Sequence, residues 1–288
     1  MDKVEVARAR IRLAYDSLQQ REPGEKLYVA YSGGKDSDVV ASLCIAELPA
    51  DCLEIAYNAT GIDPPEVVKH IKGRFEAWGN LGIQCSFNKP RANMHDLIVK
   101  MGPPTRTRRY CCDVLKEGGG DGRVVLMGVR WAESNRRAKK HDVLTVMSKD
   151  KKLRAKYSDD NEIERRIIEQ CTLRSKLTIN PIIDWSDRDV WTYIRGNNLP
   201  YCGLYDEGFR RIGCIGCPMG GRKRLREFAR WPHMYRYYVR AFADMLQKDP
   251  EYFREKCRWE TVEDVWHWWM EDGHCKGQVG MFDAGDEM

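Results

Sequence analysis

The stretch YVAYSGGKDSDVV, residues 28–40, joins an apolar run rich in aromatic and β-branched residues to a segment with helical spacing. The junction holds Gly33, Gly34 and Lys35 between Ser32 and Ser37. Glycine permits backbone conformations and close approaches that a side chain would block. The stretch therefore predicts a strand, a tight turn and a helix in succession.

Strand and helix signals continue to alternate outward from this stretch. Asp63 is expected to cap the helix after the second strand, with Pro64 as its first residue. Strands that alternate with helices predict an α/β, Rossmann-like fold, in which a parallel sheet is flanked by helices. Apolar runs predict strands at 26–32, 52–58, 83–89 and 123–129. Helical spacing predicts helices at 36–48 and 63–78.

Three regions are expected along the chain: an N-terminal helix (1–22), a central α/β domain (23–222) and a C-terminal helical lobe (223–288). Within the central domain, a basic and weakly periodic insert at about 134–178 is expected to be mobile and solvated. Order is expected to resume with a helix that Ser186 caps.

Composition limits the class of protein. The chain has 288 residues, of which 42% are hydrophobic, and a formal net charge of +5. It has no apolar run long enough to cross a bilayer and no apolar segment typical of a secretion signal. These features predict a cytoplasmic protein with no membrane partner, and they are compatible with an oligomer.

The opening turn predicts an anion site. Backbone N–H groups of a glycine turn point inward, the following helix adds its positive end, and Lys35 adds a formal charge. An ordinary glycine-rich turn is the alternative, but a lysine and two hydroxyls in one tight loop favour phosphate binding. The turn is not a Walker A loop, because Asp36 stands where that motif has a hydroxyl residue.

SGGKDS resembles the PP-loop of the N-type ATP pyrophosphatases, the adenine nucleotide alpha hydrolases with a HUP-type fold. The resemblance implies that ATP is bound by Ser32, Gly33, Gly34, Lys35, Asp36 and Ser37 and is attacked at its α-phosphate, releasing pyrophosphate. Over about 26–222 the chain is similar to the phosphoadenosine phosphosulfate reductase-like branch of that superfamily. The similarity is carried by YNATGIDPPEVVKHI, RRYCCDVLK, GVRWAESNRR, NPIIDWSDRDVW and GLYDEGFRRIGCIGCPMGG.

Site roles follow from charge and from this resemblance. Lys35 and the loop amides are expected to stabilise the leaving pyrophosphate, and Asp36 to bind Mg²⁺ directly or through water. Arg130 looks like the family's phosphate-side or ribose-side arginine, and Gly128 is expected to let the nucleotide approach. The adenine or the ribose is expected to contact Asn58, Thr60 and Asp63.

Four grouped cysteines predict a second site. Cys111 and Cys112 are adjacent, and Cys214 and Cys217 form a C-x-x-C pair with glycines beside it. Four thiolates are enough for zinc or an iron–sulfur cluster, whereas a redox dithiol or structural thiols are the simpler alternatives. The arrangement resembles the [4Fe–4S] site of adenosine phosphosulfate reductases and of the DNA-phosphorothioation enzyme, so a cluster is preferred to zinc.

Three functions stay open. ATP α-phosphate chemistry is preferred, because the loop is complete and the tail EDGHCKGQVGMFDAGDEM does not match that of sulfonucleotide reductases. A sulfonucleotide reductase using Cys275 is the runner-up, and a nucleotide-sensing binding module is the third.

The second substrate is open as well. Relatives in DNA sulfur modification and in mobile-element or CRISPR-associated systems make nucleic acid, or an accessory protein, a candidate partner. The basic and aromatic run at 220–242 offers stacking and phosphate-binding groups, although a buried aromatic helix face is the preferred interpretation.

Overall fold

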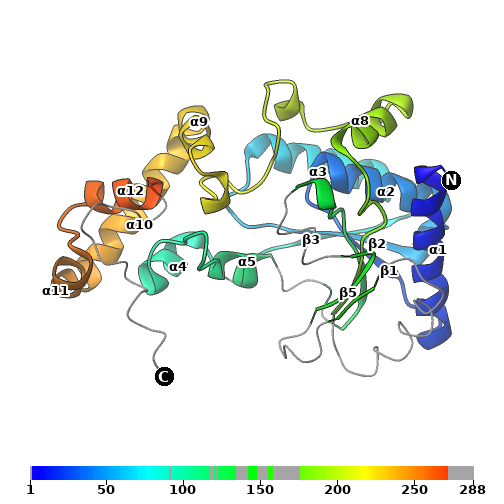
Figure 1. The fold of residues 1–288 in the computed structure, drawn as a ribbon, viewed down its shortest axis with the longest axis horizontal. Coiled ribbons are helices and arrows are strands. Elements are labelled where there is room, and N and C mark those ends of the chain that lie inside the picture. The colour runs from blue at the N-terminus through cyan, green and yellow to red at the C-terminus, as the bar shows by residue number, and fades with distance from the viewer. Residues whose placement is uncertain are drawn as a thin grey trace. The chain divides into compact units, whose positions relative to one another are not determined.

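The computed structural model describes residues 2–90, 92–116, 120, 122–133, 142–147, 155–157 and 176–271 (Figure 1). The chain divides into two compact units. Unit 1 comprises Met1–Asn58, Pro65–Asn88 and Gly119–Ile212, and unit 2 comprises Ala59–Pro64, Lys89–Gly118 and Gly213–Met288. The segments that carry the four grouped cysteines belong to unit 2, whereas the glycine loop at 32–37 belongs to unit 1.

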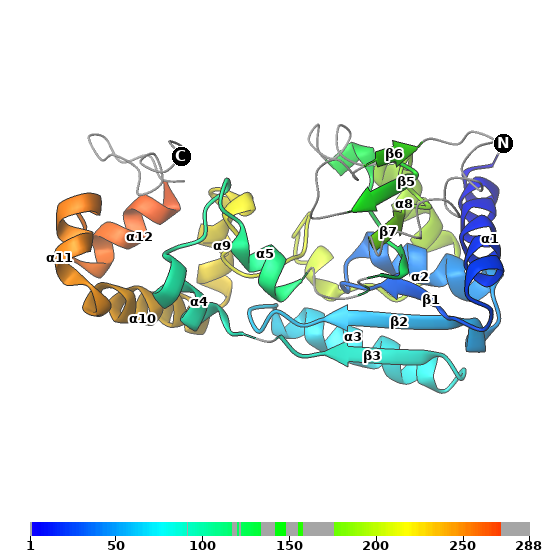
Figure 2. The same ribbon diagram turned by 90° about the horizontal axis from the view of Figure 1, so that it is seen from below.

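Unit 1 is built around one mostly parallel sheet. Its strands follow the order β3-β2-β1-β4-β7-β5-β6, as far as the chain is described. The pairs from β3 to β7 are parallel, whereas β5 pairs antiparallel with both β7 and β6. The strands are β1 (Leu27–Ala30), β2 (Leu53–Asn58), β3 (Gln84–Asn88), β4 (Val124–Leu126), β5 (Leu144–Met147), β6 (Ala155–Tyr157) and β7 (Lys176–Ile179) (Figure 2).

The central strands are buried on both faces, which explains their continuous apolar sequence. In β1, Val29 points to one face and Tyr28 to the other, and both are buried. Tyr28 packs with Ala56 of β2 and Val125 of β4. The expected parallel α/β sheet is confirmed, and β5 and β6 are additions inside the range expected to be an irregular insert.

Helices of unit 1 accompany the sheet. They are α1 (Lys3–Arg21), α2 (Lys35–Glu47), α3 (Pro65–Gly79) and α8 (Asp187–Gly196), with short 3₁₀ turns at Ala50–Cys52, Trp131–Glu133 and Gly203–Tyr205. Ser186 caps α8 as expected, and its hydroxyl accepts from the amide of Asp189 in a reciprocal capping box. The helix expected at 63–78 is present as α3, but its expected cap and first residue were wrong, because this helix begins at Pro65 and the Asp63 carboxylate accepts from Thr60 instead.

The strand order locates a crevice for a ligand. From β1 the chain passes outward to β2 and β3, and then returns to the other side of β1 as β4. The order therefore reverses between β1 and β4, and open α/β sheets bind ligands at this reversal, outside the carboxyl ends of the strands. The loop after β1 begins at Tyr31 and the segment after β4 begins at Met127, so both lie at this edge.

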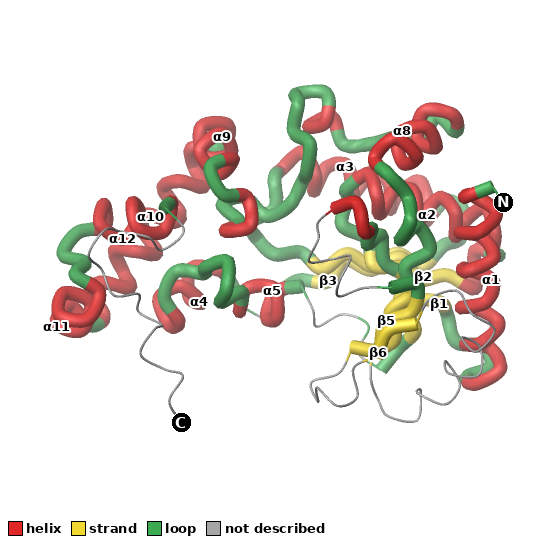
Figure 3. The backbone as a smooth tube through the Cα atoms, in the orientation of Figure 1, coloured by secondary structure: helices red, strands yellow, loops and turns green. Residues whose placement is uncertain are grey.

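The regular elements in the described part of unit 2 are all helices or short helical turns, joined by loops (Figure 3). Its longest helix, α10, packs against α4 and α12. Tyr238, Phe242 and Trp269 are buried between these helices, and the rings of Tyr238 and Trp269 stack with their centroids 4.9 Å apart. The helices are α4 (Met94–Met101), α5 (Tyr110–Leu115), α9 (Lys223–Arg230), α10 (Pro232–Lys248), α11 (Pro250–Tyr252) and α12 (Val262–Met270), with short turns at Pro218–Gly220 and Phe253–Cys257.

No helix in the described part of the chain has both the length and the apolar character that crossing a membrane requires.

Candidate functional site

The loop between β1 and α2 has the shape that its glycines predict. Gly33 has a φ of +71°, and a Cβ there would lie 2.8 Å from Ile71 Cγ1, so a side chain would both strain and crowd the turn. Gly34 is the N-cap of α2 and supplies no side-chain cap. The first amides of the helix therefore face the loop, as anion sites at helix N-termini require.

Two serines brace the loop from inside. The Ser32 amide and hydroxyl lie 3.3 Å and 3.2 Å from Ser37 Oγ, and the Ser37 hydroxyl donates to the Gly34 carbonyl at 2.8 Å. These bonds join the two ends of the loop across its turn. Ser37 therefore holds the loop shape, in addition to any contact that it makes with a ligand.

Lys35 and Arg130 are two buried cations at the start of α2, with exposed fractions of 5% and 1%. Asp36 lies between them, with Oδ2 3.1 Å from Lys35 Nζ and Oδ1 2.7 Å from Arg130 Nε. Asp187, the first residue of α8, also contacts both, with Oδ1 3.3 Å from Lys35 Nζ and 2.6 Å from Arg130 Nη2. Four side chains of alternating charge thus occupy the crevice.

This quartet shifts the ionisation of its members. Burial lowers the pKa of Arg130, but the charge of Asp36 and the hydrogen bonds to Asp187 and Asp36 outweigh it and raise that pKa overall. Burial raises the pKa of Asp187, but the Arg130 hydrogen bond and the Lys35 charge outweigh it and lower that pKa. The geometry therefore keeps Arg130 and Asp187 charged.

The segment after β4 approaches α2 closely. A Cβ on Gly128 would lie 2.9 Å from the backbone carbon and oxygen of Asp36. The structure thus gives Gly128 a packing role: it allows Arg130 to reach the first turn of α2. Arg130 also donates to the Trp185 carbonyl at 3.1 Å, which fixes its guanidinium from a third side.

Tyr205 occupies an amide of the loop. The Lys35 backbone N–H donates to the Tyr205 hydroxyl at 3.0 Å. Burial raises the pKa of this phenol, so it stays protonated at neutral pH. The Tyr205 hydroxyl therefore accepts from the Lys35 amide, which is one of the loop amides that we expect to bind a phosphate oxygen.

The buried carboxylate of Asp38 stabilises the loop between β1 and α2. Asp38, which is fully buried, accepts from the Tyr31 hydroxyl at 2.6 Å and lies 3.1 Å from His70 Nε2. Tyr31 precedes the loop and Asp38 follows it, so their bond closes the loop at its base. Burial and the Asp38 charge raise the pKa of Tyr31.

Asp187, Tyr205 and Asp38 were not predicted from the sequence. Asp187 belongs to a helix-start pattern, where a carboxylate already has a structural reason to occur. Asp38 follows the loop motif directly, and a carboxylate at the start of a largely buried, apolar helix was the signal available for it.

The predicted nucleotide contacts are only partly brought together. The loop residues, Gly128 and Arg130 lie in one group, and Asn58 ends β2 with its amide oxygen accepting from Asn88 at 3.0 Å. Thr60 belongs instead to unit 2, where it is buried and bonded to Asp63 and Cys214. This placement does not support a nucleotide contact from Thr60.

The four grouped cysteines lie near one another in unit 2. Cys111 and Cys112 are in the first turn of α5, and Cys214 and Cys217 precede the turn at Pro218–Gly220. A hydrogen bond with Cys112, burial and the charges of Cys112, Cys217 and Cys214 raise the pKa of the Cys111 thiol. All four are half-buried free thiols.

Polar partners surround Cys214. Its thiol lies 3.5 Å from Thr60 Oγ1 and 3.8 Å from Asp63 Oδ1. Lys116 is an exposed residue whose ammonium faces Cys214 and Asp63, and the Cys214 charge raises the pKa of this lysine. A cation beside the thiols would offset the charge of a thiolate-bound group.

The C-x-x-C loop is held rigidly by its backbone. Gly216, at φ +74°, donates its amide to Glu227 at 2.8 Å, and the Ile215 carbonyl accepts from Tyr238 at 2.9 Å. A Cβ on Gly216 would lie 2.8 Å from Phe228 Cζ, whereas one on Gly213 would meet no atom within 4 Å. Only the first of these two glycines is therefore required by packing.

This donor set fits a sulfur-bound group. Within the described residues, no three Cys, His, Asp or Glu side chains form a group that could hold a metal ion. An iron–sulfur cluster needs a wider arrangement of ligands, because each thiolate binds a different iron.

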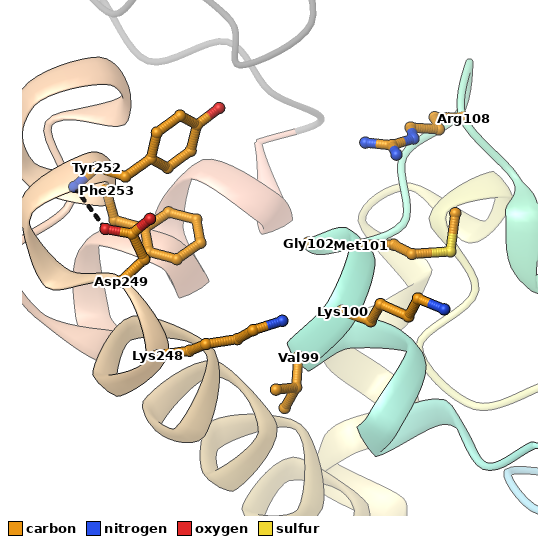
Figure 4. Close-up of a pocket in the computed structure, with 9 residues that line it drawn as sticks. All are labelled: Val99, Lys100, Met101, Gly102, Arg108, Lys248, Asp249, Tyr252 and Phe253. Carbon is orange, nitrogen blue, oxygen red and sulfur yellow. Dashed lines mark hydrogen bonds between the residues drawn. The ribbon is translucent and has the colours of Figure 1, made fainter.

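Unit 2 also contains a pocket of about 280 Å³ (Figure 4). Lys100, Arg108 and Lys248 are among its lining residues, together with Tyr252 and Phe253. Lys100 and Lys248 lie in the last turns of α4 and α10, where lysines stabilise the negative helix ends. The two carbonyl-bearing helix ends offset these cations, so the pocket does not indicate a particular ligand.

Two further predictions can be placed only in part. Trp231 and Tyr238 of the basic and aromatic run are buried, and the Tyr237 hydroxyl accepts from the His95 amide at 2.8 Å. These rings serve the packing of unit 2 and do not support base stacking. Cys275, and the parts of the insert at 134–141, 148–154 and 158–175, lie outside the described residues.

Comparison with known proteins gives the chain its family. Residues 26–219 match the phosphoadenosine phosphosulfate reductase domain. An adenosine 5'-phosphosulfate reductase from Geobacillus kaustophilus is 29% identical over 204 residues, which cover 68% of this chain and 74% of that enzyme. An uncharacterized protein from Methanocaldococcus jannaschii is 28% identical over 228 residues, which cover 73% of this chain.

The chain spans 42% of the length of that archaeal protein and 51% of a second one from the same organism. Among solved structures, phosphoadenylyl-sulfate reductase from Candida auris matches 70% of this chain and 87% of its own chain, with a TM-score of 0.44 and 16% identity. The domain match itself extends over more than half of the sequence and includes the loop, Arg130 and all four grouped cysteines. The chain therefore belongs to the phosphoadenosine phosphosulfate reductase domain family.

Proposed function

We propose that the protein is an ATP-binding enzyme that acts at the α-phosphate, releasing pyrophosphate with AMP or an adenylated product. The observation that carries this proposal is the pair of buried cations, Lys35 and Arg130, at the amide-lined start of α2. Both cations lie at the amide-lined start of a helix, where anionic groups bind, and the crevice between β1 and β4 is where this sheet type binds ligands.

Charge explains how the site would act. Attack at the α-phosphorus leaves negative charge on the departing pyrophosphate, and donors that are already in place stabilise such charge without reorganising. Lys35 and the amides of the loop would bind the leaving group, and Arg130 would bind the phosphate next to it. ATP enters as its Mg²⁺ complex, for which Asp36 offers a carboxylate.

The attacking group would be water or an oxygen of a second substrate. Water gives AMP directly, whereas an oxygen of a carbonyl or a phosphate gives an adenylated intermediate that sulfur or nitrogen can displace. The buried aromatic rings of α10 give no support for nucleic acid as this substrate, so the proposal rests on the nucleotide half of the reaction.

The test is release of AMP and pyrophosphate from ATP by anaerobically purified protein. Lys35→Ala is expected to abolish release while the melting temperature changes little, because Asp36 keeps its bond to Arg130. Lys72→Ala, on the exposed face of α3, is the matched control and is expected to keep full activity. Full turnover by Lys35→Ala would refute the proposal.

We further propose that Cys111, Cys112, Cys214 and Cys217 hold a [4Fe–4S] cluster. The cluster would supply a fixed, redox-capable charge in unit 2, and Lys116 would partly neutralise its thiolates. Iron, acid-labile sulfide and zinc contents would be measured on the wild type and on Cys214→Ser. Stoichiometric zinc without sulfide would replace the cluster with the zinc alternative, and absence of both metals would reject the site.

A second candidate function is sulfonucleotide reduction, which the relative from Geobacillus kaustophilus favours by its name. It predicts thiol-dependent formation of sulfite from adenosine 5'-phosphosulfate, with loss of activity in Cys275→Ser. ATP that binds without turnover, while the phosphosulfate is also inert, would instead favour a nucleotide-sensing module.

A further inference from the structure

Asp187 lies where a ligand phosphate is expected. Its Oδ1 contacts Lys35 Nζ and Arg130 Nη2 at 3.3 Å and 2.6 Å, and these are the two cations to which we assign the phosphates. We propose that Asp187 is an internal competitor: its carboxylate neutralises Lys35 and Arg130, the cations that we assign to phosphate binding, and must leave when a polyanionic ligand binds. The inference rests on the proposed function, since it concerns the same loop.

Of the two carboxylates in the quartet, Asp187 is the one that can leave. Asp36 has a side chain that is 19% exposed and uses both of its oxygens: Oδ1 and Oδ2 contact Lys35 Nζ, and Oδ1 also accepts from Arg130. The Asp187 side chain is 71% exposed and contacts both cations through a single oxygen. Rotation about its side-chain bonds would carry it into solvent without any movement of α8.

The start of α8 makes both positions of Asp187 acceptable. Ser186 caps this helix independently of Asp187, through its reciprocal bonds with Asp189. A carboxylate in the first turn is also stabilised by the helix dipole wherever its side chain points. The helix therefore does not depend on the contact of Asp187 with Lys35 and Arg130.

The consequence concerns net charge in the crevice. With Asp187 in place, two cations face two carboxylates, and an entering anion meets a neutral group. When Asp187 has turned away, Lys35 and Arg130 share only Asp36 and carry a net positive charge. Ligands with several negative charges can displace Asp187, whereas weakly charged anions cannot, so the contact selects for a polyphosphate.

Calorimetric titration with inorganic pyrophosphate in the absence of Mg²⁺ would test this. Asp187→Asn keeps the size of the side chain and removes its charge, so we expect pyrophosphate to bind about tenfold more tightly. Uncharged adenosine is expected to bind the variant and the wild type equally. Glu5→Gln, which removes one exposed carboxylate from α1, is the matched control and is expected to change neither affinity.

Each result has one meaning. If pyrophosphate binds the wild type, and Asp187→Asn binds it equally or more weakly, the competitor role is wrong while the proposed function stands. If adenosine affinity rises as much as that for pyrophosphate, the variant has reshaped the crevice and the inference is also rejected. If no variant binds pyrophosphate, the proposed function fails, and the inference fails with it. Asp187→Ser repeats the measurement with a side chain that also favours a helix start.

Discussion

Replacing Arg130 by methionine is expected to destabilise the protein whether or not a nucleotide is present. The guanidinium is nearly inaccessible and bonds to Asp36, Asp187 and the Trp185 carbonyl. Methionine fills much of the same volume but supplies no donor. The variant therefore leaves Asp36 and the Trp185 carbonyl without the partner around which they are arranged.

The magnitude follows from these three partners. Loss of the hydrogen bond to the charged and mostly buried Asp36 is worth about 2 kcal/mol, and loss of the bond to the uncharged Trp185 carbonyl is worth about 1 kcal/mol. The bond to the exposed Asp187 is screened by solvent and adds less than about 1 kcal/mol. The free energy of unfolding is therefore expected to fall by about 3 kcal/mol, which lowers the melting temperature by about 6–12 °C.

The assay is urea denaturation followed by circular dichroism, with the free energy extrapolated linearly to water. Arg12→Met is the matched control: Arg12 also pairs with a carboxylate, Glu47, at 2.8 Å, but its side chain is 51% exposed. Its loss is expected to cost less than about 1 kcal/mol. If Arg130→Met is no more destabilising than Arg12→Met, the burial argument for the quartet is wrong.

Three further outcomes are expected. Gly128→Ala should weaken ATP binding at least tenfold, because its Cβ would lie 2.9 Å from the Asp36 backbone. Gly73→Ala, whose Cβ would meet no atom within 4 Å, should be neutral or stabilising for the fold. Equal ATP affinities of the two variants in calorimetry would contradict this prediction. Gly216→Ala should lower the iron content of purified protein, whereas Gly213→Ala should not. The reason is that, of these two glycines, only Gly216 combines a positive φ with a 2.8 Å clash. Equal iron contents of the two variants would show that the loop tolerates a side chain. The Lys3 hydrogen bond lowers the pKa of Asp189 to about 2 in the folded protein. The ionised carboxylate therefore stabilises the fold above its unfolded pKa, and this stabilisation is lost as pH falls through about 4 to 2. Melting curves of Asp189→Asn should show a smaller loss of stability over this window than those of the wild type.

Much of unit 1 could be predicted from sequence because its local and long-range signals agree. The run at 26–32 is apolar on both faces, and the adjoining glycines and Lys35 fit one turn geometry. The strands β5 and β6 could not be predicted, since they are short and include polar residues such as Thr145 and Lys156. Their pairing depends on β7, which is far away in sequence.

The site was harder to predict than the fold. Lys35 and Arg130 belong to sequence motifs that indicate phosphate binding, whereas Asp187 contacts them only because α8 begins next to α2. Thr60 is a different case, because its position after β2 suggested the crevice while its hydroxyl is bonded to Asp63. The contacts of Asp187 join segments that are distant in sequence, whereas the Thr60 bond to Asp63 is local.

The interleaving of the two units has a consequence for the order of events on the ribosome. Cys111 and Cys112 emerge about 100 residues before Cys214 and Cys217, and most of the intervening chain folds into unit 1. At about 5–20 residues per second, the first pair waits about 5–20 s for the second. During this interval the early thiols are open to oxidation, and a nascent chain that stalls before Cys214 has only half of the thiols that the proposed cluster would need.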